Sequence, residues 1–181
     1  MLRAMPATSE RLKPLFYPRS VAVLGASNHP LKFGFNYLRA LLEFGFPGRL
    51  YPVNPKLDSI LGLKVYPALA AIPEPVDLVT VSVPAPAVPA ALRECLKHGI
   101  PGAQVLSAGF REAGAEGRRL EEEIAALARQ GIRVIGPNCF GVYSPAAGIS
   151  VGRRSAALHC CFQHMLEFIF ILWRHHCNIR N

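Results

Sequence analysis

Five turn-like stretches of small, polar or kinked residues are the part of this sequence best suited to bind a ligand. Each of them follows an apolar run. They are Gly25-Ala26-Ser27-Asn28, Asn54-Pro55-Lys56, Val83-Pro84-Ala85, Ser107-Ala108-Gly109 and Gly136-Pro137-Asn138. Turns between strands and helices commonly contain Gly, Pro, Ser and Asn, so one such turn alone would carry little weight. Their succession along the chain, with a lysine among them, favours a ligand site.

The first stretch, residues 25–28, predicts a phosphate-binding turn. A helical pattern opens just beyond it, and a helix N-terminus offers an anion free backbone N–H donors and the positive end of the helix dipole. Lys32 stands at the start of that helical pattern and would add to the positive field. The expected ligand therefore carries phosphate.

The kind of phosphate ligand follows from what the first two stretches lack. A dinucleotide fingerprint has the form G-x-G-x-x-G and is followed about twenty residues later by an acid that binds the ribose hydroxyls. Here Ser27 and Pro30 stand where the later glycines should be, and Lys56 ends the second stretch in place of an acid. A lysine at this point favours a ribose phosphate, as in coenzyme A or NADP. The alternative is a stand-alone NAD(P)-binding redox sensor or oxidoreductase domain.

The elements that would position these stretches alternate between two periodicities. Apolar runs typical of buried strands are followed by helical patterns. The predicted strands are 20–24, 49–53, 78–83, 103–106 and 132–135, and the predicted helices are 33–46, 86–99 and 114–131, after a short leading helix or turn at 9–16. This alternation predicts an α/β fold with a Rossmann-like, doubly wound parallel sheet of about five strands. Ligands bind such sheets outside the carboxyl ends of the strands, which is where the turn-like stretches fall.

Composition limits the other function classes. The 181 residues are 51% hydrophobic and 18% charged, which fits one well-packed domain. The net charge of +8 suggests an anionic partner, but no Lys/Arg run is interleaved with aromatic residues, so no nucleic-acid partner is predicted. No apolar run is long enough to predict a membrane span, and the N-terminus lacks a signal-peptide core. With five cysteines and no Cys-x-x-Cys spacing, a cytoplasmic location is expected.

Longer motifs carry a family resemblance over about residues 12–150. They are Gly25-Ala26-Ser27-Asn28-x-Pro30-x-Lys32-x-Gly34, Tyr51-Pro52-Val53-Asn54-Pro55-Lys56, Val83-Pro84-Ala85, Ser107-Ala108-Gly109-Phe110-x-Glu112 and Gly136-Pro137-Asn138-Cys139-x-Gly141. In this order they resemble the N-terminal CoA-binding domain of NDP-forming (ADP-forming) acyl-CoA synthetases, a family related to the α subunit of succinyl-CoA synthetase. The resemblance implies that coenzyme A or an acyl-CoA binds along the carboxyl ends of the strands.

The same resemblance implies roles for individual residues. Residues 25–28 would form the phosphate turn, Lys56 would bind a CoA phosphate, and the turns at Val83 and Ser107 would line the path of the nucleotide and the pantetheine. The full set of expected binding residues is Gly25, Ala26, Ser27, Asn28, Lys32, Asn54, Lys56, Val83, Pro84, Ala85, Ser107, Ala108, Gly109, Pro137 and Asn138.

Catalysis in the parent enzymes passes through an acyl phosphate and a phosphohistidine, and the resemblance implies that these steps belong to other domains. The phosphohistidine lies in a second domain and the nucleotide binds an ATP-grasp region, while no histidine of this chain stands in the matching context. No catalytic residue is therefore predicted, and Cys139 is interpreted as a small buried residue because no base accompanies it. The expected function is a CoA-binding portion, truncated or separate, of such a ligase, with the remaining synthetase domains or subunit as partners.

Residues 151–181 differ in character from residues 1–150, which form the predicted CoA-binding domain. His and Cys residues of this tail could ligate zinc, but their spacing fits no common site, so no metal is predicted. The apolar run 165–173 could cover the sheet or mediate association as a helical extension. The favoured interpretation is a non-native extension that follows a break in the reading frame.

Overall fold

The computed structural model describes residues 8–149. The expectations for residues 151–181, which concern their His and Cys residues and their apolar run, lie outside the described residues. Between residues 8 and 149, no helix combines the length and the apolar character needed to cross a membrane.

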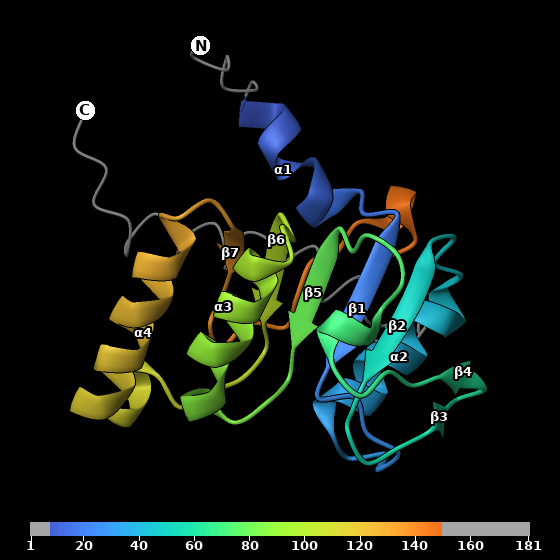
Figure 1. Cartoon of the computed structure of the whole chain (residues 1–181), viewed down its shortest axis with the longest axis horizontal. Coiled ribbons are helices and arrows are strands. Elements are labelled where there is room, and N and C mark those ends of the chain that lie inside the picture. The colour runs from blue at the N-terminus through green and yellow to red at the C-terminus, as the bar shows by residue number, and fades with distance from the viewer. Residues whose placement is uncertain (1–7, 150–181) are drawn as a thin grey trace, which may run out of the picture. The chain divides into compact units, whose positions relative to one another are not determined.

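A parallel sheet of five strands forms the centre of the domain (Figure 1). Its strands are β1 (Ser20–Leu24), β2 (Arg49–Val53), β5 (Leu78–Val81), β6 (Gly102–Val105) and β7 (Arg133–Ile135). Their order is β2-β1-β5-β6-β7, with Val21 of β1 paired to Leu50 on one side and to Leu78 on the other. From β1 the chain first goes to β2 on one side and then returns to the other side of β1, where β5, β6 and β7 follow in order. The strand order therefore reverses at β1. In open α/β sheets the crevice at such a reversal is the usual ligand position.

Helices cover both faces of the sheet, as the alternation of periodicities predicted. Figure 1 shows α3 (Val88–Lys97) and α4 (Ala115–Ala128) in front of the strands and α2 (Phe33–Phe44) behind them. Alternate residues of β1 point to opposite faces: Ala22 packs with the α3 and α4 side, whereas Val21 and Val23 pack with the α2 side. A strand buried on both faces has to be apolar at every position, which explains the unbroken runs in the sequence.

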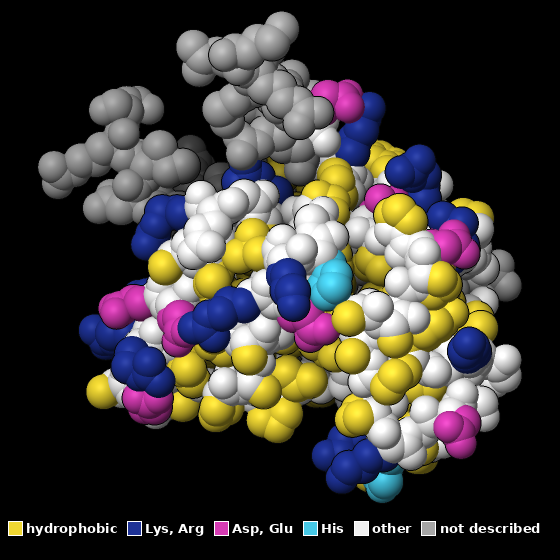
Figure 2. Space-filling model, in the orientation of Figure 1, with side chains coloured by type: hydrophobic (Ala, Val, Ile, Leu, Met, Phe, Trp, Pro, Cys, Tyr) yellow, Lys and Arg dark blue, Asp and Glu magenta, His cyan; other side chains and the backbone are white. Residues whose placement is uncertain are grey.

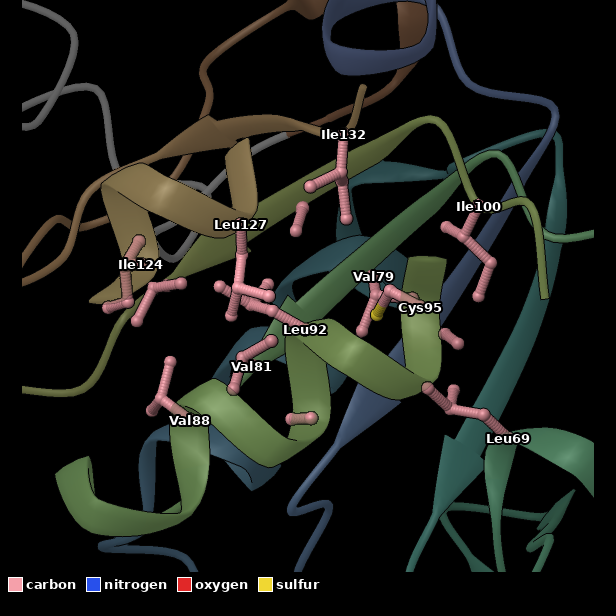
Figure 3. Packing of buried hydrophobic residues seen from close by; sticks show 14 of the residues in the cluster. Leu69, Val79, Val81, Val88, Leu92, Cys95, Ile100, Ile124, Leu127 and Ile132 are labelled. Atoms are coloured by element: carbon pink, nitrogen blue, oxygen red, sulfur yellow. The ribbon is translucent and has the colours of Figure 1, made fainter. Parts of the chain in front are cut away.

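The core between the sheet and the two front helices is shown in Figure 3. Leu92 and Cys95 of α3 and Leu127 of α4 pack with Val79 and Val81 of β5. Each fully buried side chain of this size contributes about 1.5–3 kcal/mol to stability. Burial also raises the pKa of the Cys95 thiol to about 12, so this cysteine packs as an apolar group.

Several element ends differ from the sequence-based expectation. The helix predicted to reach residue 46 ends at Phe44, because Gly45 adopts a left-handed conformation (φ +74°) and the N–H of Phe46 turns back to the carbonyl of Leu41. The strand predicted over 78–83 ends at Val81, and the helix predicted over 86–99 begins with a separate 3-10 turn, η2 (Ala85–Ala87).

The remaining elements are short. They are α1 (Thr8–Phe16), the antiparallel pair β3 (Ser59–Ile60) and β4 (Leu63–Lys64), and the 3-10 turns η1 (Leu69–Ala71), η3 (Arg111–Ala113) and η4 (Pro145–Ala147). Figure 1 shows α1 beyond the amino ends of the strands, on the side away from the turns that follow β1, β5 and β6.

Candidate functional site

The turns that follow the five parallel strands form one edge of the sheet, called the carboxyl rim below. All of the predicted binding residues lie on this rim or at the start of the helix that leaves it. Parallel strands make this gathering unavoidable, because their carboxyl ends meet at the same edge.

The turn after β1 lies at the reversal point and is tightly packed. Gly25 has φ +87°, and a Cβ there would stand 2.3 Å from the carbonyl oxygen of Ser82, just beyond β5. A Cβ on Gly34, in the first turn of α2, would stand 2.3 Å from the carbonyl oxygen of Gly25. Only glycine fits at either position. The start of α2 therefore packs directly against the backbone of the turn.

The N-terminus of α2 suits an anion. Lys32 occupies the N-cap position without a side-chain cap, and the first turn of the helix contains no acidic residue. The preceding loop is held by its own side chains, since the N–H of His29 donates to Ser27 Oγ at 3.1 Å and the N–H of Leu31 donates to His29 Nδ1 at 3.2 Å. The Ser27 hydroxyl keeps its hydrogen for a further acceptor. Free amide donors, a helix dipole and a lysine thus meet at one place.

Asn54 joins the turns after β1 and β2. Its side-chain amide donates to the carbonyl of Ala26 at 2.6 Å, and its Oδ1 accepts from the N–H of Lys56 at 2.8 Å. This side chain is therefore occupied in fixing the backbone of Lys56 next to the first turn. Lys32 and Lys56 are both exposed, and neither is paired with a carboxylate within the part of the chain that the structure describes.

The arginines over α3 and α4 behave differently. Arg119 pairs with Glu116 at 2.7 Å, Arg111 pairs with Glu121 at 3.1 Å, and Arg93 pairs with Glu123. Figure 2 shows the resulting mixture of basic and acidic side chains on this face. Such a surface does not form the continuous basic patch that binds a polyanion.

The turns after β5, β6 and β7 are bonded to one another. Ser107 Oγ donates to the carbonyl of Val83, and the N–H of Asn138 donates to the carbonyl of Ser107 at 2.9 Å. Glu112 accepts from the N–H of Gly109 at 2.7 Å and from the amide of Asn138 at 3.3 Å. The Gly109 N–H bond is the main reason why the pKa of Glu112 is lowered. Glu112 is not among the predicted binding residues, although its place in the motif that begins at Ser107 is the signal that could have identified it.

Cys139 follows this rim but lacks the properties of a nucleophile. It is half-buried, its Sγ donates to the carbonyl of Val105 at 3.3 Å, and burial raises the pKa of the thiol. Since the reactive form of cysteine is the thiolate, a raised pKa supports the interpretation of Cys139 as a packing residue.

A buried polar network that the sequence analysis missed lies beneath the rim. Gln104 of β6 is fully buried; its amide donates to the hydroxyls of Tyr37 and Thr80, and its Oε1 accepts from the N–H of Val142 at 3.0 Å. Burial raises the pKa of Tyr37 to about 12, so its hydroxyl stays protonated. The network ties α2, β5, β6 and the chain after β7 together. The sequence signal for this network is weak: Thr80 and Gln104 are polar residues in the middle of the otherwise apolar strands β5 and β6.

Among the described residues, two neighbouring hollows lie on the rim. One has a volume of about 220 Å³ and is lined by residues that include Leu31, Phe33, Leu106 and Phe140. The other, of about 140 Å³, shares the last three of these residues and adds Ser107 and Asn138 among others. A larger hollow of about 350 Å³ lies elsewhere, beside α1, and contains none of the predicted binding residues. Size alone therefore does not locate the site.

No metal centre is evident in the described portion: residues 8–149 contain no group of three or more His, Cys, Asp or Glu side chains arranged to hold an ion.

Known proteins match about three quarters of this chain. A family model described as "CoA binding domain" matches residues 19–145. The acetate–CoA ligase (ADP-forming) II of Archaeoglobus fulgidus is 46% identical over 138 residues, which cover 76% of this chain and 20% of the relative. The α subunit of acetate–CoA ligase (ADP-forming) I of Pyrococcus furiosus is 43% identical over 141 residues, which cover 75% of this chain and 30% of the relative.

A solved structure shares the fold. The dinucleotide-forming acetyl-coenzyme A synthetase 1 of Ca. Korarchaeum cryptofilum, in complex with phosphate and ADP, matches with a TM-score of 0.74 and 42% identity over 80% of this chain and 32% of that chain. The predicted Rossmann-like fold is thereby confirmed. The chain spans between 20% and 32% of the length of these relatives.

Proposed function

Since this chain belongs to the CoA-binding domain family and matches part of the ADP-forming acyl-CoA synthetases, we propose that its carboxyl rim binds coenzyme A or an acyl-CoA. The family predicted from the motifs is confirmed by these matches. Which rim residues touch the ligand, and which larger activity the domain serves, are parts of the proposal.

The observation that carries the proposal is the packing of α2 against the turn after β1. Because Gly25 and Gly34 have no Cβ, the uncapped start of the helix lies against residues 25–28 at the reversal point of the sheet. A diphosphate placed there would receive backbone N–H donors, the Ser27 hydroxyl and the charge of Lys32. Lys56, held beside it by Asn54, would bind the 3′-phosphate of the ribose.

The other predicted residues would line the remainder of the ligand. Val83-Pro84-Ala85 would flank the nucleotide, and Ser107-Ala108-Gly109 with Pro137 and Asn138 would border the pantetheine. Hydrogen bonds within the protein join these three turns to one another, which supports a preformed path.

An NAD(P)-binding redox domain is the competing function. An NAD-binding domain would need an acid after β2 to bind the unphosphorylated ribose, and Lys56 stands there instead. Lys56 would suit the ribose phosphate of NADP, but the turn after β1 lacks the G-x-G-x-x-G fingerprint, since Ser27 and Pro30 replace its later glycines. A thermal-shift titration of the 181-residue chain separates the two functions. Coenzyme A at 100 times its Kd should stabilise the fold by about 2.7 kcal/mol and raise the Tm by several degrees. NADH and NADPH at the same concentration should leave the Tm unchanged, and the opposite ranking would reject coenzyme A as the ligand.

The similarity to acetate–CoA ligases supports a larger role. The domain would present coenzyme A to an acyl group that other parts of a synthetase activate, whether those parts lie on the same polypeptide or on another subunit. A relative named as an α subunit supports the arrangement on separate subunits.

A further inference from the structure

Three large apolar side chains lie unusually exposed beside the carboxyl rim. Leu31 is 84% exposed, Phe33 is 58% exposed and Phe140 is 64% exposed. They come from two distant segments, the start of α2 with the loop before it and the chain after β7, and together they line the hollow of about 220 Å³. Exposed apolar groups that gather around a hollow, unlike single scattered ones, mark a surface that something covers.

This hollow is continuous in its lining with the path proposed for the pantetheine. Phe33, Leu106 and Phe140 also line the second hollow, of about 140 Å³, whose other walls include Ser107 and Asn138. The polar path along the rim therefore passes into an apolar end. We call the two hollows together the rim groove.

The polar atoms at the apolar end are already engaged. The side-chain amide of Asn36 donates to the carbonyls of Pro30 and Lys32, and its oxygen accepts from Arg39 at 3.0 Å. The hydroxyl of Tyr37 is buried and bonded to Gln104. What this end offers a ligand is carbon surface.

We infer that the rim groove holds the acyl group of a bound acyl-CoA and selects apolar groups of about the size of a benzene ring. The inference rests on the proposed function, because the thioester has to enter along the rim. An apolar cavity of roughly 150 Å³ is known to accommodate benzene, so a hollow of about 220 Å³ has room for such a ring. A ring bound there would also remove the faces of Phe33 and Phe140 from water.

Calorimetric titration of the whole chain with coenzyme A, acetyl-CoA and benzoyl-CoA tests the inference. Benzoyl-CoA should bind about tenfold more tightly than acetyl-CoA, because the ring buries more apolar surface than a methyl group. Binding of all three with equal affinity would overturn the acyl groove and leave the proposed function standing. Failure of all three to bind would reject the proposed function itself, and the inference with it.

Two substitutions locate the effect. Phe33→Ala and Phe140→Ala should each reduce the ratio of benzoyl-CoA to acetyl-CoA affinity to about twofold, because each removes one wall of the groove. Both side chains are largely exposed, so neither substitution should prevent folding. Phe16→Ala is the matched control, since Phe16 is an exposed phenylalanine on α1, away from the rim, and should keep the ratio unchanged. If benzoyl-CoA still bound about tenfold more tightly than acetyl-CoA in both Phe33→Ala and Phe140→Ala, the acyl group would bind elsewhere.

Discussion

The two rim lysines are held in different ways. Lys56 is fixed through its backbone, because its N–H donates to Asn54 Oδ1 while the amide of Asn54 holds the carbonyl of Ala26. Lys32 is placed by the helix it precedes. Both side chains lie in solvent without a carboxylate partner among residues 8–149, so each is available to a phosphate. The backbone anchor of Lys56 supports a specific role for it.

Replacement of Lys56 by alanine should distinguish that role. Under the proposed assignment, Lys56→Ala lowers the affinity for coenzyme A about tenfold, because a hydrogen bond to a charged group is worth about 1.5 kcal/mol. The affinity for dephospho-CoA, which lacks the 3′-phosphate, should change by no more than about twofold. Calorimetric Kd values for the two ligands give the comparison directly.

Lys97→Ala serves as the matched control for this substitution. Lys97 is exposed in the last turn of α3, at the end of that helix which lies away from the rim. Its loss should alter neither Kd. If Lys56→Ala lowered the affinities for coenzyme A and dephospho-CoA equally, Lys56 would not bind the 3′-phosphate.

At the scale of elements, the Gln104 network decides how the rim is supported. Strand β6 presents Gln104 to the α2 side of the sheet, where its three hydrogen bonds reach a helix, a neighbouring strand and the segment after β7. That last segment carries Asn138 and Phe140. The network therefore supports this part of the site from below, and one of its members, Tyr37, also lines the hollow of about 220 Å³.

Two substitutions at Gln104 should differ in their pH dependence. Gln104→Leu leaves the Tyr37 and Thr80 hydroxyls and the Val142 N–H without this partner, and should lower the free energy of unfolding by about 2–3 kcal/mol at every pH. Gln104→Glu can still donate and accept while protonated. Burial disfavours its charged form, so its folded-state pKa lies above the unfolded value of about 4.3, and its stability should fall as the pH rises above that value.

Urea denaturation of both variants and the wild type at pH 4.5 and pH 8 measures these effects. Gln130→Leu is the control, because Gln130 is exposed beyond the end of α4 and its loss should change stability by less than about 0.5 kcal/mol. A Gln104→Glu variant as stable at pH 8 as at pH 4.5, relative to the wild type, would contradict the network described above.

The sequence predicted the strands and helices well because buried parallel strands have to be apolar throughout. Residues 20–24 and 49–53 were predicted to their last residue. The predicted element ends were less accurate. The apolar pattern continues to Phe46, but α2 ends at Phe44 because Gly45 adopts a left-handed conformation. The rim could be predicted because topology alone brings the carboxyl ends of the strands together. The hydrogen-bond network of Gln104 could not be predicted, because its partners lie 24 to 67 residues away along the chain.

At the scale of the whole described domain, residues 8–149, different features lie at the two opposite edges of the sheet. The carboxyl rim contains the predicted phosphate turn, the lysines and the rim groove, whereas α1 and the larger hollow lie beyond the amino ends of the strands. In the described portion, the rim supplies hydrogen-bond donors and apolar surface, while its cysteine has a raised pKa. These are the properties of a binding surface. Under the proposed function, activation of the acyl group is left to other parts of a synthetase.

The 181-residue chain should therefore bind coenzyme A without forming acyl-CoA. In a reaction with ATP, Mg²⁺, coenzyme A and acetate or benzoate, we expect no thioester product above the rate measured without protein, with a full-length ADP-forming acetate–CoA ligase as the positive control. The same preparation should bind coenzyme A with a stoichiometry of one per chain, which shows that inactivity does not arise from misfolding. Thioester formation that depends on this chain would overturn its assignment as a binding portion and would require a nucleophile or phosphate acceptor within it. Inactivity with intact binding would instead direct the search to a partner that supplies the activated acyl group.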